Sequence, residues 1–479
     1  MFKNTFWSST IVYSLGFLFL RAISFLLLPL YTNILNPVDL GQVFIFITFL
    51  GFMNAIYAFG MDSALLKYYD SEKNILSTSL ISIGIFAIPV SLIIYLNSHF
   101  ISLFLFNNSL NAESWMFNNN IWILFAIAIL FLDVVSSRLI TLVRILNLPW
   151  YYLTVATINI VSSISLTLYF LHFRMPTMKF DGVILAMLCV AVIQCLALLP
   201  VGIKKIKRYQ FNYSMFRKMF SFAWPFFPAT LFFIIIEMSD RIMIERFLSL
   251  QEVGLYGAGY KIGALMLMIV RGFNISWQPY YLKYGENIDS KGVLNFAYIG
   301  NVMLLVLILI AGVISSIYPI LLSIKIYSFS IMGERFLSGA QVIPYILVSY
   351  VFYGFFIFQM PSIYIKNKQN WAPLFWGLGA IINVIGNLIL LPKLGYIGAA
   401  ISTLLAYCTM SITLLYKNYS WFWIPYNFKI LFVSVFISVL QYFLFGYFVL
   451  PIYKIFILGI YIISMSVLLY IAKSEKQTI

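Results

Sequence analysis

Apolar stretches long enough to cross a lipid bilayer recur from one end of this sequence to the other. A hydrocarbon core of about 30 Å needs roughly 20 apolar residues per helix. The sequence predicts about fourteen such spans, at 8–30, 40–62, 75–97, 118–138, 150–172, 182–203, 220–247, 253–275, 293–317, 339–364, 371–391, 395–416, 428–448 and 451–472. Because backbone polar groups in lipid must be satisfied within the protein, this pattern predicts an all-α polytopic membrane protein.

The composition excludes a water-soluble fold. Hydrophobic residues make up 62% of the 479 residues and charged residues 9%, whereas a soluble domain has about a quarter of its residues charged. A net charge of +15 would suggest nucleic acid in a soluble protein. In a membrane protein the same excess is typical of cytoplasmic loops, which are rich in Lys and Arg. No nucleic-acid partner is therefore expected.

The distribution of basic residues predicts the orientation. With the N-terminus inside, nineteen of the 30 basic residues fall in cytoplasmic segments and seven in outer segments. Arg138 and Arg144 belong to the cytoplasmic set, after the fourth span. This asymmetry predicts that both termini are cytoplasmic. The largest basic cluster, KKIKRYQFNYSMFRK at 204–218, is interpreted as an anchor beside anionic headgroups or as a linker between two halves.

Two sets of matches at one separation predict an internal repeat. Matched residues at a separation of 213 are Asp39 with Glu252, Gly41 with Gly254, Gly182 with Gly395, and Ala186 with Ala399. Six spans separate the copies, so the repeats have parallel topology, an arrangement found in many transporters. The predicted domains are a six-helix bundle at 1–203, the basic linker 204–218, a second pseudo-symmetric six-helix bundle at 219–417, and two additional spans in 418–479.

Five stretches in order along the chain resemble oligosaccharide flippases of the multidrug/oligosaccharidyl-lipid/polysaccharide (MOP) exporter superfamily, polysaccharide transporter family. They are LNPVDLGQVF (35–44), GMDSALLKYY (60–69), SDRIMIERFLSLQEVGLYGAGYKIG (239–263), WQPYYLKY (277–284) and LGYIGAAISTLLAY (394–407). The stretch 239–263 is the most specific. The sequence departs from the family pattern at Asn36, where Gly is frequent, and at Gly259, where Ala is frequent.

The resemblance implies two six-helix bundles around a central cavity and transport by alternating access. It implies a cargo of oligosaccharide linked to undecaprenyl pyrophosphate, used for O-antigen (lipopolysaccharide), capsule or exopolysaccharide biosynthesis. The implied location is the bacterial cytoplasmic (inner) membrane. The implied partners are the lipid-linked oligosaccharide, membrane lipids, and a polysaccharide polymerase with other assembly proteins.

Four cations inside predicted spans are candidates for substrate binding: Arg21, Arg241, Lys261 and Arg271. A charge at the centre of a span costs roughly 2.5–3.5 kcal/mol, which favours a position facing a partner or a wet cavity. Arg binds phosphate oxygens in a bidentate manner and Lys acts as a point charge, so these residues suit an anionic headgroup. Snorkelling to the membrane surface is the alternative for Arg21 and, more strongly, for Arg271.

Four acids are candidates for ion coupling: Asp62, Asp133, Glu237 and Asp240. Glu237, Arg241 and Glu245 are spaced by four and share one helix face. They can therefore form an internally paired stack instead. Asp62 and Asp133 lie near cytoplasmic span ends, where a structural cap or an ion pair is the more ordinary role.

Prolines mark the start of the seventh predicted span. Pro225 and Pro228 either begin the helix or provide a bend.

Catalytic signatures are missing from the sequence. It contains no GxSxG, Walker A, HExxH or Gly-rich nucleotide motif, so an enzyme is not predicted and no cofactor is expected. Cys189, Cys195 and Cys408 lie in apolar runs and form no cluster with His99 or His172. No metal site follows from them.

Two other functions compete with the flippase hypothesis. A drug or cation antiporter of the same superfamily would favour deep acids over deep cations. An integral-membrane glycosyltransferase, such as a polymerase or ligase, would favour active-site residues on a long outer loop. The longest predicted outer loops, near 98–117 and 318–338, are nearly free of Arg, His and Asp.

Overall fold

A computed structural model describes residues 23, 25–69, 75–106, 121–175, 177–206, 210–285, 288–326, 329–448 and 450–477. The chain forms two compact units, Met1–Gly257 and Ala258–Ile479. Arg21 and most of the first predicted span lie outside the described residues, which include the short apolar helix Phe25–Ile34 of that span.

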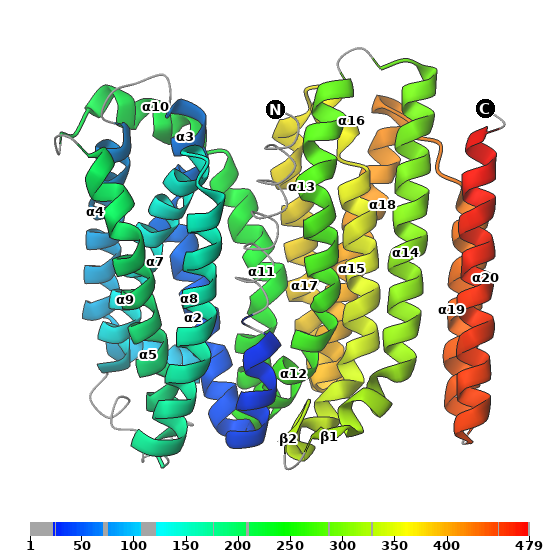
Figure 1. The fold of residues 1–479 in the computed structure, drawn as a ribbon, viewed down its shortest axis with the longest axis horizontal. Helices are drawn as coiled ribbons and strands as arrows, with labels where there is room; N and C mark the ends of the chain where they lie inside the picture. Colours follow the sequence, from blue (N-terminus) through cyan, green and yellow to red (C-terminus); the bar gives the residue numbers. More distant parts are fainter. Residues whose placement is uncertain are drawn as a thin grey trace. The chain divides into compact units, whose positions relative to one another are not determined.

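The first unit consists of helices (Figure 1). They are α2 (Pro37–Ala58), α3 (Met61–Tyr68), α4 (Ile75–Leu96), α5 (Ser98–Phe106), α7 (Ile121–Ile145), α8 (Pro149–Leu168) with its π-helical end η1 (Tyr169–Arg174), α9 (Lys179–Lys205), α10 (Tyr213–Ala223), α11 (Phe226–Phe247) and most of α12 (Leu250–Gly263). Helix α9 packs against α7 and α8, and α7 also packs against α2 and α4.

The second unit repeats this packing. Its elements are α13 (Leu265–Gly285), α14 (Ser290–Ser323), β1 (Lys325–Ile326), β2 (Phe329–Ser330), the 3-10 helix η2 (Glu334–Val342), α15 (Ile343–Phe358), α16 (Pro361–Ile365), η3 (Gln369–Trp371), α17 (Ala372–Leu394), α18 (Tyr396–Trp421), α19 (Phe428–Tyr447) and α20 (Pro451–Gln477). Helix α18 packs against α15 and α17, as α9 does against α7 and α8, and α19 and α20 pack against α14. Strands β1 and β2 form one antiparallel pair.

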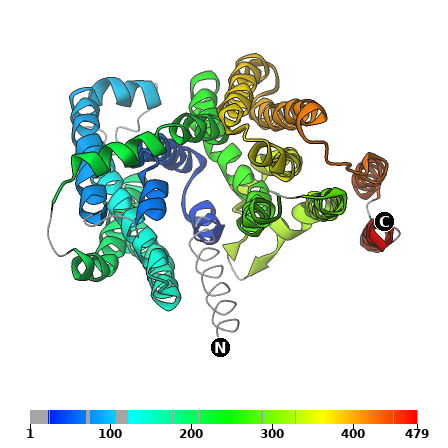
Figure 2. The ribbon, with the colours of Figure 1, turned by 90° about the horizontal axis from the view of Figure 1, so that it is seen from above.

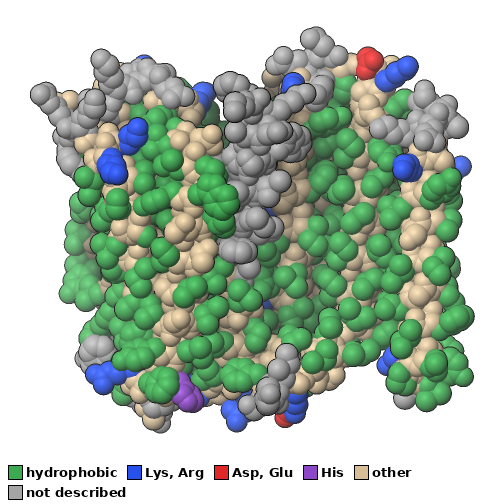
Figure 3. Space-filling model, viewed as in Figure 1, with side chains coloured by type: hydrophobic (Ala, Val, Ile, Leu, Met, Phe, Trp, Pro, Cys, Tyr) green, Lys and Arg blue, Asp and Glu red, His purple; other side chains and the backbone are tan. Residues whose placement is uncertain are grey.

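The described helices confirm the predicted fold class. Eleven of them are long and apolar enough to cross a membrane, and the number rises to 13 if each of two bent pairs is one span. These 13 correspond to the second through fourteenth predicted spans. In each unit, hydrophobic side chains cover the visible surface between the helix ends, and Lys and Arg lie mainly near those ends (Figure 3). An acyl-chain environment suits such a surface.

The two matches of the predicted repeat differ in the structure. Gly41 and Gly254 lie near the starts of α2 and α12, which begin 213 residues apart at Pro37 and Leu250. By contrast, α9 begins at Lys179 and α18 at Tyr396, a separation of 217. Gly182 therefore lies inside a helix, whereas Gly395 precedes one with a φ of 61°. Unequal connections between the helices move the two copies out of the register that the sequence match assumes.

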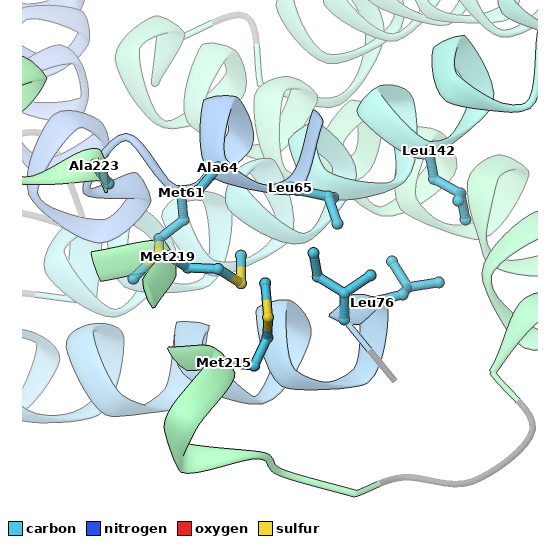
Figure 4. Packing of buried hydrophobic residues seen from close by; sticks show 9 residues of the cluster. Met61, Ala64, Leu65, Leu76, Leu142, Met215, Met219 and Ala223 are labelled. Carbon is cyan, nitrogen blue, oxygen red and sulfur yellow. The ribbon is translucent and has the colours of Figure 1, made fainter. Parts of the chain in front are cut away.

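The segment 204–218 is mostly helical. Helix α9 continues to Lys205, and α10 begins at Tyr213. In Figure 2, which is seen from above, α10 is viewed from the side, so it runs across the ends of the long helices of its unit. Its buried Met215, Met219 and Ala223 pack with Met61, Leu65 and Leu76 of α3 and α4 (Figure 4). On its other face, Arg217 and Lys218 are exposed. The compact first unit accordingly extends through α10 and α11 to Gly257.

Two helix breaks meet in the first unit. Between α2 and α3, Phe59 and Gly60 both have left-handed backbone angles, with φ of 46° and 68°. Between α10 and α11, the chain bends by 47° at Trp224 and Pro225, so the prolines do mark a bend. The Phe59 ring stacks against four others, those of Phe86, Phe220, Trp224 and Phe227, with centroid distances of 4.5–5.7 Å.

Candidate functional site

The candidate cations Lys261 and Arg271 lie on the two arms of one bent span. Helices α12 and α13 are interrupted at Ala264 and bend by 41°. Lys261 precedes the break and Arg271 follows it, and both side chains are partly buried. An interruption of this kind in a span is tolerated where neighbouring groups or water satisfy the freed backbone groups.

Lys261 lies opposite the face of α12 that packs within the second unit. A Cβ added at Gly259 would meet Gly339 and Val342 of η2, and one added at Gly263 would meet Ile346 of α15. At 100° per residue, Lys261 lies about 180° from these two glycines. Its Cα–Cβ bond is thus directed away from α15 and its apolar neighbours.

Arg271 lies on the side of the packing face of α13. The most buried residues of α13 are Met266, Val270, Trp277 and Tyr281, each at most 2% exposed, and they form one stripe at helical spacing. Arg271 is about 110° from the centre of that stripe. The guanidinium group is therefore at the edge of the packed surface, consistent with its partial burial.

Arg241 belongs to a buried cluster in the first unit. Its Nη1 donates to Asp240 Oδ1 at 2.8 Å and to the carbonyl oxygen of Glu237 at 2.6 Å. The Tyr256 hydroxyl of α12 donates to Asp240 Oδ2, and the guanidinium lies 5.9 Å from the centre of the Tyr256 ring. Asp240 is 0% exposed and Arg241 8% exposed. The hydrogen bond from Tyr256 links α12 to α11, and the ion pair compensates the charges of Asp240 and Arg241.

Glu237 and Glu245 accompany this cluster on α11. They are 7% and 3% exposed, so they are buried within the protein like Asp240 and Arg241. One ion pair of Arg241 is with its sequence neighbour Asp240. The spacing of four predicted pairing along the helix, and it did not indicate this contact between adjacent residues.

Asp62 forms an ion pair with Arg138. Ser137 Oγ donates to Asp62 Oδ2 at 2.7 Å, and Arg138 Nη2 donates to the carbonyl oxygen of Ala58 at 2.7 Å. That carbonyl is at the end of α2, where the break leaves backbone groups without helical partners. Arg138 thus holds α2, α3 and α7 together at the break.

Sequence reasoning ended the fourth span too early. The span was expected to end at Arg138, but this residue lies inside α7 and is 1% exposed. The helix continues to Ile145 because the residues after Arg138 remain apolar. This continuation of the apolar pattern was the available signal. The tyrosine partner of Asp240, Tyr256, had no such signal in the sequence.

Asp133 lies on α7 one turn before Ser137 and is partly buried. Among the described residues, no hydrogen bond or ion pair joins its carboxylate to another group. Within the same part of the chain, no group of three or more His, Cys, Asp or Glu residues is placed to hold a metal ion.

A family model described as "Polysaccharide biosynthesis protein" matches residues 6–285, more than half of the chain. The chain belongs to this family. A curated relative of this polysaccharide biosynthesis protein is the uncharacterized membrane protein MJ1068 of Methanocaldococcus jannaschii. It is 23% identical over 420 residues, which cover 83% of this chain and 81% of the relative.

Solved transporter structures share the fold of this chain. The lipid II flippase MurJ, in an inward closed conformation, superposes with a TM-score of 0.70 at 15% identity, covering 97% of this chain and 98% of MurJ. An inward-facing multidrug resistance MATE family transporter of the MOP superfamily gives a TM-score of 0.63 at 13% identity, covering 84% and 94%. The predicted resemblance to a polysaccharide family is confirmed by the family model. At these identities the structural likeness shows the fold.

Proposed function

We propose that this polysaccharide biosynthesis protein is a flippase that moves an undecaprenyl-pyrophosphate-linked oligosaccharide across the cytoplasmic membrane by alternating access. The product would supply O-antigen, capsule or exopolysaccharide assembly, with a polymerase among the partners. The proposal includes cytoplasmic termini and transport without a catalytic step.

One observation supports the proposal above all: Lys261 and Arg271 lie on the two arms of the bent α12–α13 span. Both are partly buried, and Lys261 faces away from α15. A cation in such a position is stabilised by a wet, anion-accepting environment. A pyrophosphate group provides the complementary charge, with Arg binding its oxygens and Lys acting as a point charge.

The arrangement of the acids favours this cargo over the cation of an antiporter. Asp62 is paired with Arg138, and Asp240 is paired with Arg241. Two of the acids considered for ion coupling, Asp62 and Asp240, thus have a structural partner of opposite charge. Asp133 stays a candidate for coupling, because it is partly buried on α7.

Transport by purified protein in liposomes tests the proposal. The probe is a fluorescent undecaprenyl-pyrophosphate oligosaccharide, and the readout is the rate at which the label crosses to the far leaflet. We expect Lys261→Ala to slow this rate about tenfold or more, since each 1.4 kcal/mol of lost interaction is a factor of ten. Lys261→Arg, which keeps the charge, should retain most of the rate.

The matched control is Lys393→Ala, which removes an exposed lysine from the last turn of α17. It should transport like the wild type. Equal transport rates for Lys261→Ala and the wild type, at equal protein level, would show that Lys261 does not bind the headgroup. Absence of transport by the wild type, combined with proton-driven efflux of a cationic dye, would replace the flippase by an antiporter.

A further inference from the structure

A cavity with both polar and apolar walls lies at the start of α14 in the second unit. Its volume is about 720 Å³, and its walls are the first turns of α14, the segment Pro425–Lys429 before and at the start of α19, and Ala472 of α20. We call it the basic pocket. From the predicted orientation, it opens toward the cytoplasmic surface of the membrane.

The charges around the basic pocket are mainly positive. Lys291 and Lys429 line it and are exposed, and exposed Lys473 follows Ala472. The described acid beside the pocket is Asp289, whose side chain already accepts the backbone N–H of Gly292 at 2.8 Å. Among the described residues that line the pocket, none is an acid. An anion is therefore the favoured occupant.

A buried amide provides a neutral hydrogen-bond donor in the same pocket. Asn301 lines it and is 9% exposed. Its Oδ1 accepts the backbone N–H of Asn427 at 3.2 Å, while its Nδ2 donates to no group among the described residues. Asn301 Nδ2 is not one of the buried polar atoms that lack a partner, so it faces the open space of the pocket. An acceptor oxygen of a bound molecule would satisfy it.

An apolar groove continues from the basic pocket into the membrane. This groove, of about 780 Å³, runs between α14, α15, α18 and α19, and Phe428 lines both cavities. Along α14 it extends from Leu304, one turn beyond Asn301, to Ser315, a length of about 17 Å. That length exceeds half of a hydrocarbon core of about 30 Å, so the groove can hold a hydrocarbon chain.

We propose that the basic pocket and the apolar groove together bind one anionic phospholipid of the membrane. Its phosphodiester lies between Lys291, Lys429 and Asn301, and one chain lies along α14 and α19. Compact ammonium groups suit a single phosphate charge, whereas a pyrophosphate is better matched by arginine. The bound chain fills the space between α19 and the helices α15 and α18. The site is distinct from Lys261 and Arg271 and does not depend on the proposed transport activity.

Native mass spectrometry of the detergent-purified full chain tests the site. The probes are phosphatidylglycerol and phosphatidylcholine with identical chains. The wild type should bind phosphatidylglycerol about tenfold more tightly than phosphatidylcholine. Lys291→Ala/Lys429→Ala should abolish this preference, and Lys291→Arg/Lys429→Arg should restore it. The matched control, Lys366→Ala/Lys368→Ala, removes two other exposed lysines of the same unit and should bind like the wild type.

A groove variant tests the position of the chain independently of charge. Val435 lines the groove and is 48% exposed, so Val435→Trp fills the groove without displacing buried side chains. It should weaken the binding of both lipids, while gel filtration confirms a folded monodisperse protein. Equal phosphatidylglycerol binding by wild type and the double alanine variant would overturn the proposal. Displacement of phosphatidylglycerol by an equimolar amount of undecaprenyl phosphate would assign the site to an isoprenyl lipid and also overturn it.

Discussion

Gly41 and Gly254 contact each other reciprocally where α2 crosses α12. A Cβ on Gly41 would lie 1.9 Å from the carbonyl oxygen of Leu250, and a Cβ on Gly254 would lie 2.0 Å from that of Pro37. Gly254 follows Gly41 by 213 residues, and Leu250 follows Pro37 by 213. The two matched segments at the starts of α2 and α12 thus meet through equivalent atoms, as in a local two-fold arrangement.

Alanine at either glycine should destabilise the protein strongly. A Cβ in these positions overlaps backbone atoms, which cannot move as a flexible side chain can, so a loss at or above the usual 1–3 kcal/mol for overpacking is expected. Thermal unfolding of the detergent-purified protein, followed by gel filtration, measures the change. Gly459→Ala is the matched control, because nothing lies within 4 Å of the added Cβ among the described residues. An unchanged melting temperature for Gly41→Ala would contradict the close crossing.

Arg138→Ala should cost about 1–3 kcal/mol, the usual loss when a buried acceptor is left without its donor. The Asp62 side chain is 31% exposed, so water replaces part of the lost ion pair. The substitution also removes the donor to the carbonyl oxygen of Ala58 at the break of α2. Arg144→Ala, at an exposed position of the same helix, should have little effect. Chemical denaturation of both variants and of Asp62→Asn measures the difference. A loss for Arg138→Ala no larger than for Arg144→Ala would argue against the ion pair.

Tyr256→Phe should destabilise the cluster around Asp240 by about 1–3 kcal/mol, because it leaves a buried carboxylate oxygen without its hydroxyl donor. Asp240→Asn should cost more, since Arg241 then keeps a buried charge without its ion-pair partner. Thermal melts of the two single variants and the double variant form a cycle that measures the coupling. Additive losses in the double variant would contradict a shared cluster.

A fluorescent protein fused to the C-terminus should fold and fluoresce in the cytoplasm, and alkaline phosphatase fused after Arg174 should be active outside. Both results follow from the excess of Lys and Arg in the segments predicted to be cytoplasmic. Fusions after Lys205 provide the opposite control, with active fluorescent protein and inactive phosphatase. The reverse pattern at either site would require an inverted topology.

Hydrophobic length predicted the spans well because it is a local property of the sequence. The helix Ile75–Leu96 differs by one residue from the predicted span 75–97, and Phe428–Tyr447 differs similarly from 428–448. Helix ends inside apolar sequence were less predictable. The break at Ala264 interrupts an apolar run, and only the contacts of Gly259 and Gly263 with η2 and α15 indicate why α12 ends there.

Charged residues were located in sequence but not assigned to their partners. Asp62 and Arg138 are 76 positions apart, and their ion pair depends on how α3 packs against α7. The short range of helical spacing predicted pairs along α11, yet Tyr256 reaches Asp240 from the next helix. The candidate site at Lys261 and Arg271 rested on depth in the span, a property that sequence provides directly.

The stack around Phe59 has a mechanical consequence for the two bends beside it. Parallel aromatic faces keep a fixed spacing, but offset positions of the rings have similar energies, so sliding in the plane meets less resistance than separation. The rings of Phe86, Phe220, Trp224 and Phe227 that stack on Phe59 therefore allow the α2–α3 break and the α10–α11 bend to slide past each other while staying in contact. A smaller side chain at Phe59 would remove the contact between the two breaks even if every helix kept its length.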